Sequence, residues 1–427
     1  MKILLYSMNF TPELVGIGKY SGEMAQWLHA KGHDVRVIAS PPFFPNWAPF
    51  EGYSAWAYRK TDWNGITVWR APTWVPARPR ALARLAHLFS FMVSSMPLLF
   101  AQIRWKPDLV FVVEPPLFCA PAVLFFSRML GIKSWLHIQD YEVDAAFGMR
   151  LVRGVRLRRF ALSVESWLLS RFNRVSTISS AMLDKAKNKG IDETRLVLLP
   201  NWVDARLIFP QSAAASVAGQ PTNGYRGMLG IAADEVVVLY AGSLGAKQGI
   251  ELLADAAHRL VAAAHIHFVF CGNGPSREPL KAACANLPRV HFIDLQPAER
   301  LNELLGMADI HVLPQRADAA DLVMPSKLAG MLASGKAVIV TAHAGTELSN
   351  VVSGRGMVVA PGDADALAEA IAQLAMSRPQ REAMGAAARS FAETELDRNA
   401  ILQRLERELL RCVAEPLAVP APTGSRP

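Results

Sequence analysis

Glycines follow three apolar segments of the sequence at positions that suit phosphate binding. The first loop contains Gly16 and precedes a helical pattern, so free backbone N–H groups would lie at the start of a helix. The other two loops lie in the second half of the chain and contain Gly242, Ser243, Gly272 and Gly274. Glycine lets a backbone approach a ligand closely, although each loop taken alone could equally be an ordinary tight turn.

Two lysines accompany the glycines of the second half. Lys247 precedes a predicted helix that follows the Gly242 loop, and Lys327 comes after Ser326, a residue type typical of the start of a helix. A lysine ammonium beside such a turn can hold a diphosphate as a point charge. Any single lysine is more often simply solvated, but several phosphate-compatible turns in one chain together predict a diphosphate ligand.

Ionisable side chains gather at the end of another apolar segment, residues 133–138. His137 lies within this segment, and Asp140, Glu142 and Asp144 follow it. A carboxylate here could accept the proton of an attacking hydroxyl or stabilise an oxocarbenium-like centre. For Glu142 and Asp144 we favour a plainer role, because acidic residues complement the dipole at the start of a helix. His137 could equally be a hydrogen-bonded core histidine.

These side chains need a scaffold, and the sequence alternates strand-like and helix-like segments throughout. This pattern predicts an α/β fold with two Rossmann-like, doubly wound parallel sheets. Each sheet would bind its ligand at the carboxyl ends of its strands, and domains that face each other would place that ligand in a cleft. The predicted strands are 2–7, 34–39, 109–113, 133–138, 174–178, 196–199, 236–240, 266–271, 309–313, 337–341 and 356–359.

Composition suggests where the domains divide. Residues 211–230 are rich in Ala, Ser, Gly and Asn without periodicity, which is typical of a boundary. We therefore expect an N-terminal domain over 1–210 and a C-terminal domain over 211–378. A helix over 379–412 would cross back onto the first domain, and 413–427 would form a disordered tail.

The two halves differ in charge. Residues 1–210 contain 26 Lys and Arg against 15 Asp and Glu, a net charge of +11, whereas residues 211–427 contain 19 against 22, a net charge of −3. A hydrophobic fraction of 51% and a charged fraction of 19% exclude a disordered chain. The four cysteines lie far apart without metal-binding spacing, which indicates a reducing compartment and no metal site.

Two segments of the basic half could contact a membrane. Residues 85–103 lack Asp, Glu, Lys and Arg, but their large apolar side chains recur with helical period. This is typical of a buried helix, or of one lying in a membrane surface, rather than of a span. Residues 150–160 interleave five arginines with apolar residues. Anionic lipid suits this run better than nucleic acid, and a solvated helix face is the alternative.

Aromatic residues are concentrated in the segment 43–74, which includes Trp47. Such rings stack on sugars and also favour a membrane interface. Packing of a proline-rich loop is the alternative and explains part of the concentration.

In this order the motifs resemble those of the family 4 retaining glycosyltransferases, which have the GT-B architecture. Within that family, Pro325-Ser326-Lys327-Leu328 and Phe44-Pro45-Asn46-Trp47 resemble the subgroup that builds bacterial exopolysaccharide repeat units, including colanic acid. That subgroup includes fucosyl transferases. The resemblance covers residues 1 to about 395 and rests on the segments 12–20, 199–204, 240–249, 335–339 and 361–363.

The resemblance implies roles for individual residues. Asp140 would approach the acceptor hydroxyl and the transferring sugar, with His137 and Trp47 beside the acceptor, and Lys247 would stabilise the departing diphosphate. The donor would be held by Gly16, Gly242, Ser243, Lys247, Gly272, Gly274, Asp321, Ser326, Lys327 and Glu347.

The sequence departs from the family at its hallmark pair of glutamates, which are separated by seven intervening residues. The corresponding positions are Leu322 and Gly330. Asp321 is adjacent to the first, and Glu347 is a candidate substitute for the second, which usually holds the nucleotide ribose. A degenerate, inactive site is the alternative.

We therefore expect a glycosyltransferase attached peripherally to the inner face of the cytoplasmic membrane. It would move a sugar, for example from GDP-fucose, to a lipid-linked saccharide, with retention of configuration and without a metal. Its partners would be a nucleotide sugar, the lipid-linked saccharide acceptor and an anionic membrane surface, with no nucleic acid. The alternatives are a nucleotide-sugar 2-epimerase, which leaves the basic aromatic half unexplained, and a non-catalytic membrane-bound scaffold.

Overall fold

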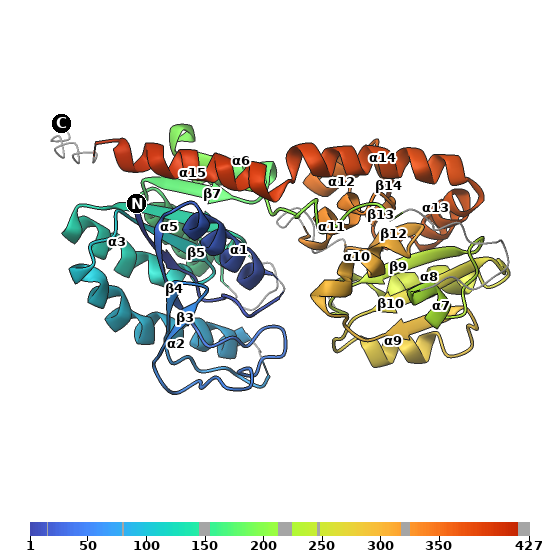
Figure 1. Cartoon of the computed structure of the whole chain (residues 1–427), viewed down its shortest axis with the longest axis horizontal. Coiled ribbons are helices and arrows are strands. Elements are labelled where there is room, and N and C mark those ends of the chain that lie inside the picture. Colours follow the sequence, from blue (N-terminus) through green and yellow to red (C-terminus); the bar gives the residue numbers. More distant parts are fainter. Residues whose placement is uncertain are drawn as a thin grey trace. The chain divides into compact units, whose positions relative to one another are not determined.

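The computed structural model describes residues 1–14, 16–78, 81–144, 154–211, 224–245, 248–316 and 325–416. They form two compact units, each with its own sheet (Figure 1). The first unit is Met1–Pro200 together with the chain from Leu402 onward, and the second is Asn201–Ile401. The division thus falls after Pro200, whereas the linker composition predicts it after residue 210.

Residues 201–211 belong to the second unit because their backbone is bonded to it. The Val203 N–H donates to Leu396 O (2.9 Å), and the Phe209 N–H donates to Asn302 Oδ1 (3.0 Å). Composition alone marks the variable stretch that follows but does not reveal these long-range bonds.

The first unit contains one sheet among its described residues. Its strands are β1 (Lys2–Tyr6), β2 (Asp34–Ala39), β3 (Arg59–Trp63), β4 (Ile66–Arg70), β5 (Leu109–Glu114), β6 (Lys133–Ile138), β7 (Arg174–Thr177) and β8 (Leu196–Leu198). They lie in the order β3-β4-β2-β1-β5-β6-β7-β8, and all neighbours run parallel except β3 and β4. Every residue of β5 and β6 is buried, as expected when helices cover both faces of a parallel sheet.

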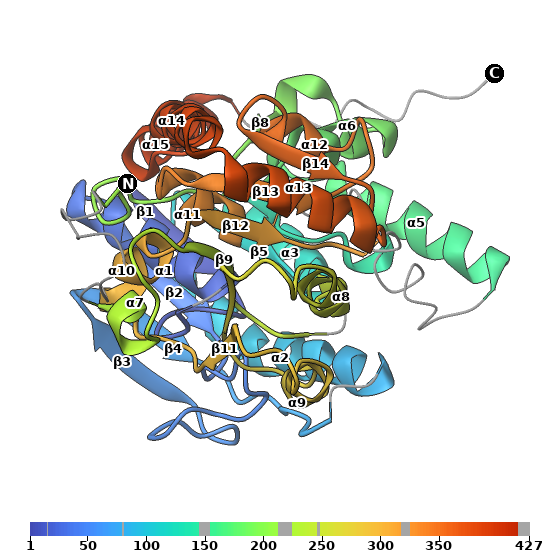
Figure 2. The same cartoon turned by 90° about the vertical axis from the view of Figure 1, so that its right-hand side faces the viewer.

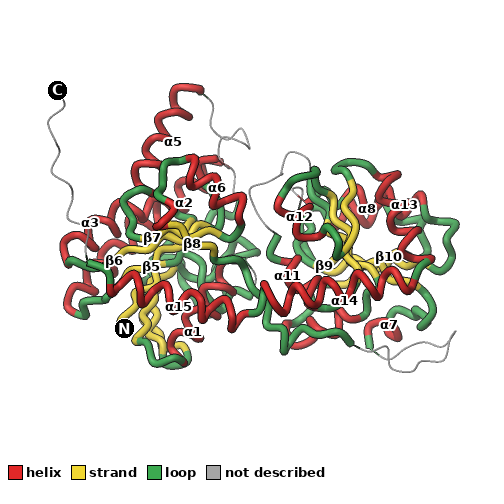
Figure 3. The backbone as a smooth tube through the Cα atoms, turned by 90° about the horizontal axis from the view of Figure 1, so that it is seen from above, coloured by secondary structure: helices red, strands yellow, loops and turns green. Residues whose placement is uncertain are grey.

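The helices of this unit lie on both sides of the strands (Figure 3). They are α1 (Ile17–Ala30), α2 (Ala81–Ala101), α3 (Ala120–Leu130), α5 (Val155–Leu169), α6 (Ser180–Asn188) and, from Leu402, most of α15 (Arg398–Ala414). Helix α5 projects away from the rest of the unit (Figures 2 and 3).

The β3–β4 hairpin was not predicted from the sequence. Asn64 and Gly65 form its turn with φ of 51° and 81°, which is the Asn-Gly signal of a two-residue hairpin loop. For the segment 43–74 we considered sugar stacking, a membrane interface and, as the alternative, packing of a proline-rich loop, and we predicted no strand there, whereas Arg59–Trp63 and Ile66–Arg70 form β3 and β4.

The second unit contains a parallel sheet in its described part. Its strands are β9 (Val236–Ala241), β10 (Ile266–Cys271), β11 (Val290–Ile293), β12 (Ile310–Leu313), β13 (Ala337–Thr341) and β14 (Gly356–Val359), in the order β11-β10-β9-β12-β13-β14. Its helices are α7 (Tyr225–Met228), α8 (Glu251–Arg259), α9 (Arg277–Ala283), α10 (Leu301–Gly306), α11 (Lys327–Ala333), α12 (Glu347–Val352), α13 (Ala364–Met376) and α14 (Arg378–Glu395).

The segment predicted as one helix over 379–412 is two helices, α14 and α15. The break at Leu396 and Asp397 has a local cause. Leu396 O accepts the Val203 N–H outside the helix, and Asp397 Oδ1 caps α15 by accepting from the Ala400 N–H (2.9 Å). The chain passes from the second unit to the first at Leu402, and α15 then packs its buried leucines into the first unit. Helix α15 extends to Ala414, and residues 417–427 lie outside the described residues.

Candidate active site

Four loops of the second unit follow parallel strands that are neighbours in its sheet. Gly242 follows β9, Gly272 follows β10, Lys327 lies between β12 and β13, and Glu347 follows β13. Because β10, β9, β12 and β13 are adjacent, these loops gather at one edge of the sheet. This is the edge at which open α/β sheets bind their ligands.

Two of the glycine loops pack backbone against backbone. The Gly242 N–H donates to Cys271 O (2.8 Å). Gly272 and Gly274 have φ of +139° and +153°, and a Cβ on either would overlap a carbonyl oxygen of the facing loop. Only glycine satisfies both the positive φ and this contact, so these glycines shape the loops directly.

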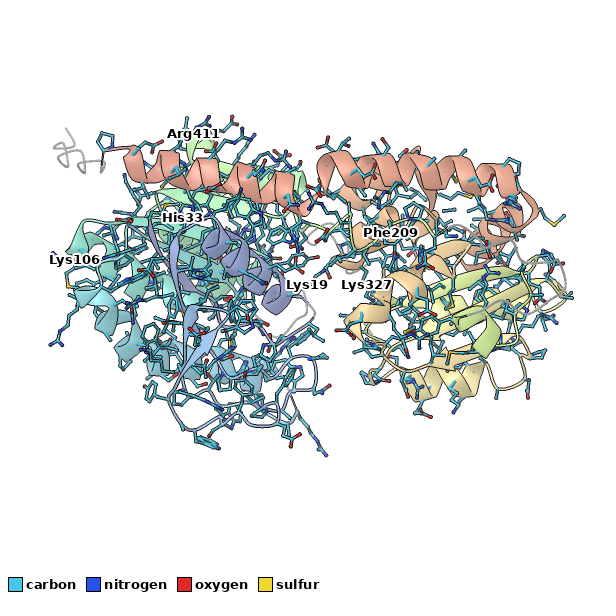
Figure 4. The ribbon with its side chains drawn as sticks, viewed as in Figure 1. Lys19, His33, Lys106, Phe209, Lys327 and Arg411 are labelled. Atoms are coloured by element: carbon cyan, nitrogen blue, oxygen red, sulfur yellow. The ribbon has the colours of Figure 1, made fainter. Side chains whose placement is uncertain are left out.

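Lys327 crosses the end of β9 (labelled in Figure 4). Its Nζ donates to the Tyr240 hydroxyl (2.7 Å) and lies 4.4 Å from the centre of the Tyr240 ring. A Cβ on Gly242 would overlap the lysine side chain, so glycine at this position permits the crossing. Burial lowers the pKa of Lys327 to about 8. A desolvated ammonium beside two glycine loops is a suitable counter-charge for a diphosphate.

The other predicted donor residues have different placements. Lys247 and Asp321 lie outside the described residues. Ser326 precedes α11, but its backbone is already helical and its side chain makes no capping hydrogen bond, so the predicted N-cap is not formed. Ser243 is exposed on the Gly242 loop. Glu347 is partly buried and begins α12.

The Gly16 loop of the first unit is tied to the aromatic segment by Glu13. Gly16 has φ of +61° directly before α1. The buried Glu13 carboxylate accepts hydrogen bonds from the N–H groups of Phe43 and Phe44 (2.9 Å each) and from Asn9 Nδ2 (2.9 Å). Glu13 therefore holds two loops together, a role that the sequence analysis did not assign.

Asp140 belongs to a group of acidic side chains at the carboxyl edge of the first sheet. Glu114 ends β5, and Asp140 and Glu142 follow the adjacent β6. Glu114 is fully buried, and among the residues that the structure describes neither of its carboxyl oxygens has a hydrogen-bond partner. Burial and the charge of Glu142 raise the pKa of Glu114 well above its usual value, and the nearby Glu142 N–H opposes this only in part.

The neighbouring Glu142 also has a raised pKa. Burial raises the pKa of Glu142 to about 7, although its carboxylate accepts a hydrogen bond from the Leu117 N–H (2.5 Å). Glu114 and Glu142 together can therefore retain a proton near neutral pH. Glu114 was not predicted as a site residue, although its signal is present in the sequence: an acidic residue that ends an otherwise apolar strand.

Asp144 lies in a separate ion-paired group. It forms ion pairs with Lys185 (2.8 Å) and Lys189 (3.0 Å), and Lys189 also pairs with the buried Glu165. These pairs, rather than a helix dipole alone, explain the position of Asp144. They anchor α5 and α6 beside the acidic group.

The two predicted acceptor residues differ in accessibility. His137 is buried in β6, where Nδ1 lies 2.9 Å from Ser176 Oγ and Nε2 lies 2.9 Å from Gln139 Nε2. Burial lowers the pKa of His137 to about 3. This placement favours the core role over the acceptor role. Trp47 is partly buried against Phe43 (ring centres 5.4 Å apart), so it keeps some accessible surface.

A candidate membrane surface lies on the first unit. Helix α2 and the residues after it, 82–104, are long and apolar enough to cross a membrane by length and composition. However, its Phe91, Ser95 and Leu99 are buried in the unit, whereas a span surrounded by lipid would be apolar all round. We therefore interpret α2 as an amphipathic helix. Exposed large apolar side chains in or next to α2, α3 and α5 include Leu82, Phe89, Val93, Phe118, Phe125, Met129, Val155, Leu157, Phe160 and Trp167.

The chain matches two family models, the glycosyl transferase 4-like domain over residues 15–202 and the glycosyl transferases group 1 over residues 235–377. It is 40% identical to WcaI from Escherichia coli strain K12, named as a colanic acid biosynthesis glycosyl transferase, over 96% of this chain and 100% of the relative. Its fold is similar to that of sucrose-phosphate synthase from Thermosynechococcus elongatus, with a TM-score of 0.74, 19% identity, and coverage of 96% and 98% of the two chains. HepE from Anabaena in complex with UDP-glucose gives a TM-score of 0.68 at 16% identity over 96% and 100%.

These findings confirm the predicted fold class, two parallel-sheet α/β domains of GT-B type, and the predicted kind of enzyme. The chain belongs to the family of glycosyltransferases in which a glycosyl transferase 4-like domain is followed by a group 1 glycosyl transferase domain.

Proposed function

We propose that this glycosyltransferase moves a sugar from a nucleotide-diphosphate sugar to a lipid-linked saccharide during assembly of an exopolysaccharide of the colanic acid type. Transfer would retain the anomeric configuration and leave a nucleoside diphosphate. The polymer class is supported by the name of the 40% identical relative, and a sugar nucleotide is supported by the UDP-glucose bound to HepE. GDP-fucose is our first candidate donor, and UDP sugars are the next.

The observation that carries this proposal is the position of Lys327. Its ammonium lies at the carboxyl edge of β9, against the Gly242 loop and the Tyr240 hydroxyl. A departing diphosphate develops negative charge, and a preorganised, desolvated cation stabilises that charge strongly. Lys247 would add a second cation, so we propose that the reaction needs no metal ion.

The acceptor would bind at the carboxyl edge of the first sheet. Asp140 lies there beside Glu114 and Glu142, which can hold a proton near neutral pH. We propose that Asp140 contacts the acceptor hydroxyl or the transferring sugar, and that the two glutamates keep the region from accumulating negative charge.

The lipid part of the acceptor would approach from the surface formed by α2, α3 and α5. Helix α5 exposes Arg156, Arg158 and Arg159 among apolar side chains and projects from the unit (Figure 2). Arginines and apolar residues on one projecting helix suit an anionic membrane surface. We propose peripheral attachment at the cytoplasmic face of the membrane, and Arg150 and Arg153, outside the described residues, would add to it.

Thermal-shift measurements test the nucleotide site without an acceptor. GDP or UDP at about one hundred times its Kd should stabilise the protein by about 2.7 kcal/mol. Lys327→Gln should lose most of this stabilisation, while Lys281→Gln, which removes an exposed lysine from α9, should keep it.

The alternatives have separate outcomes. A non-catalytic scaffold would show no nucleotide-dependent shift, and this result would contradict the proposal. An epimerase would interconvert a sugar nucleotide with no acceptor present, which sugar analysis by NMR would detect.

A further inference from the structure

A hollow of about 350 Å³ opens on the first unit beside the β3–β4 hairpin. Its lining includes Pro41, Tyr53, Tyr58, Arg59 and Arg70. Pro41 follows the end of β2, and Arg70 is the last residue of β4, which runs parallel to β2. The hollow therefore lies at the carboxyl edge of the sheet, the same edge that carries the Gly16 loop and the Asp140 group.

Two arginines face each other across the hairpin. Arg59 and Arg70 are directly opposite in the antiparallel pairing of β3 and β4, a position where like charges destabilise a sheet. Among the described residues, neither guanidinium forms an ion pair with a carboxylate; their hydrogen bonds go to backbone carbonyl groups of Gly52, Ser40 and Thr11.

Arg70 is the more unusual of the two. It is buried at 3% exposure, and its Nε–H has no hydrogen-bond partner in the described part of the chain. The charge of Glu13 acts on it, but burial dominates and lowers the pKa of Arg70 to about 10. Burying a cation whose charge and hydrogen bonds are only partly satisfied costs free energy of folding. An anion that binds beside the cation would reduce this cost.

Tyrosine rings form the other walls. The guanidinium carbons of Arg59 and Arg70 lie 5.5 and 5.6 Å from the centre of the Tyr53 ring. The Tyr58 hydroxyl donates to Ser94 O (2.7 Å), which holds the side chain while it remains 53% exposed. The tyrosine rings provide a stacking surface for a sugar ring, and the arginines beside them provide hydrogen-bond donors for an anionic group.

We propose that this hollow is an acceptor subsite that recognises an acidic saccharide, through the carboxylate or phosphate group that the saccharide carries. Arg59 and Arg70 would bind the anion, and Tyr53 and Tyr58 would contact the sugar ring. The inference rests on the proposed function, because it assigns a substrate class to the acceptor side of the same enzyme.

Ligand-observed NMR titrations of the full chain test the subsite with glucuronate, glucose and inorganic phosphate as probes, in the absence of nucleotide. The wild-type protein should bind glucuronate about tenfold or more tightly than glucose. Arg59→Gln should weaken glucuronate binding about tenfold. Lys60→Gln removes the same charge from the next residue of β3, where the lysine lies over Trp69 instead, and should leave binding unchanged.

The phosphate probe separates the two sources of charge. Phosphate binding that depends on Arg59, without glucuronate binding, would support the proposal and identify a phosphorylated sugar. Tyr58→Ala should weaken binding of glucuronate but not of phosphate. Equal affinities for glucose and glucuronate, together with no phosphate binding, would overturn the proposal. Equal losses of glucuronate affinity in Arg59→Gln and Lys60→Gln would also overturn it. Because the nucleotide-dependent thermal shift is measured independently, either proposal can fail without the other.

Discussion

At the scale of single residues, Lys327 is the lysine whose ammonium group lies beside the glycine loops of the second unit. The sequence alone identifies Lys247 and Lys327 as candidates, because both follow loops of the predicted second sheet. It cannot show that Lys327 contacts Gly242 and Tyr240, since that contact joins distant residues through the strand order.

The lowered pKa of Lys327 predicts how nucleotide affinity changes with pH. Below about pH 8 the ammonium is charged and can pair with a diphosphate, and above it the free enzyme loses this charge. Affinity for GDP or UDP should therefore fall between pH 7 and about pH 9, with a slope of up to about tenfold per pH unit. Lys327→Arg should flatten this dependence, because arginine stays charged. Isothermal titration calorimetry at several pH values would measure both, and identical profiles would count against a role for Lys327.

Glu142 predicts a pH-dependent stability. Its folded-state pKa, about 7, lies above that of an unfolded glutamate, so its ionisation destabilises the fold as pH rises from about 4.5 through about 7. Glu142→Gln should then stabilise the protein by about 3 kcal/mol at pH 8 and give almost no gain at pH 4.5. Chemical denaturation at the two pH values would measure the difference. A gain that does not depend on pH would show that the carboxyl group is not perturbed as described.

At the scale of elements, the strands with buried apolar runs could be predicted, because their composition alone specifies them. All the strands predicted in the sequence are present, and β3, β4 and β11 were missed. None of the three is a continuous buried apolar run: β3 is mostly polar and exposed, β4 alternates buried and half-buried residues, and β11 is half-buried throughout. The hollow beside Arg59 depends on the β3–β4 pairing, and for that reason the sequence analysis could not locate it.

The contact between the Gly242 and Gly272 loops predicts that adding one methyl group at Gly272 lowers both stability and nucleotide binding. Gly272→Ala places a Cβ against Gly242 O at a positive φ, and should cost about 2–4 kcal/mol of stability together with most nucleotide binding. Gly354→Ala is the matched control, since Gly354 also has positive φ but nothing within 4 Å of the added Cβ. It should cost only about 1 kcal/mol. Thermal unfolding with and without GDP or UDP gives both quantities, and equal effects would refute the backbone contact.

At the scale of the whole molecule, the charge asymmetry of the sequence corresponds to the two units. The basic first unit carries the exposed apolar residues of α2, α3 and α5, and the acidic second unit carries the glycine loops and Lys327. The proposed anionic membrane on one unit, and the proposed anionic donor held by local groups on the other, would account for this distribution.

Liposome flotation tests the membrane surface. The wild-type protein should float with anionic liposomes, and the triple variant Arg156→Gln, Arg158→Gln, Arg159→Gln should lose about 1 kcal/mol of binding free energy per arginine. The control removes three exposed arginines from α15 of the same unit, with Arg404→Gln, Arg407→Gln and Arg411→Gln. Equal losses of liposome binding in the two triple variants would indicate that net charge alone causes binding. Failure of the wild-type protein to float would contradict the proposed membrane attachment.

We propose that this chain transfers a sugar from a nucleotide-diphosphate sugar and that Lys327 is needed for the transfer. The most direct measurement is the release of nucleoside diphosphate from a panel of GDP and UDP sugars, with and without a membrane extract that supplies the lipid-linked acceptor. We predict acceptor-dependent release by the wild-type protein and by Lys281→Gln, and a loss of about one hundredfold or more in Lys327→Gln. Near-normal turnover by Lys327→Gln, with the wild-type enzyme active on the same donor, would contradict the account.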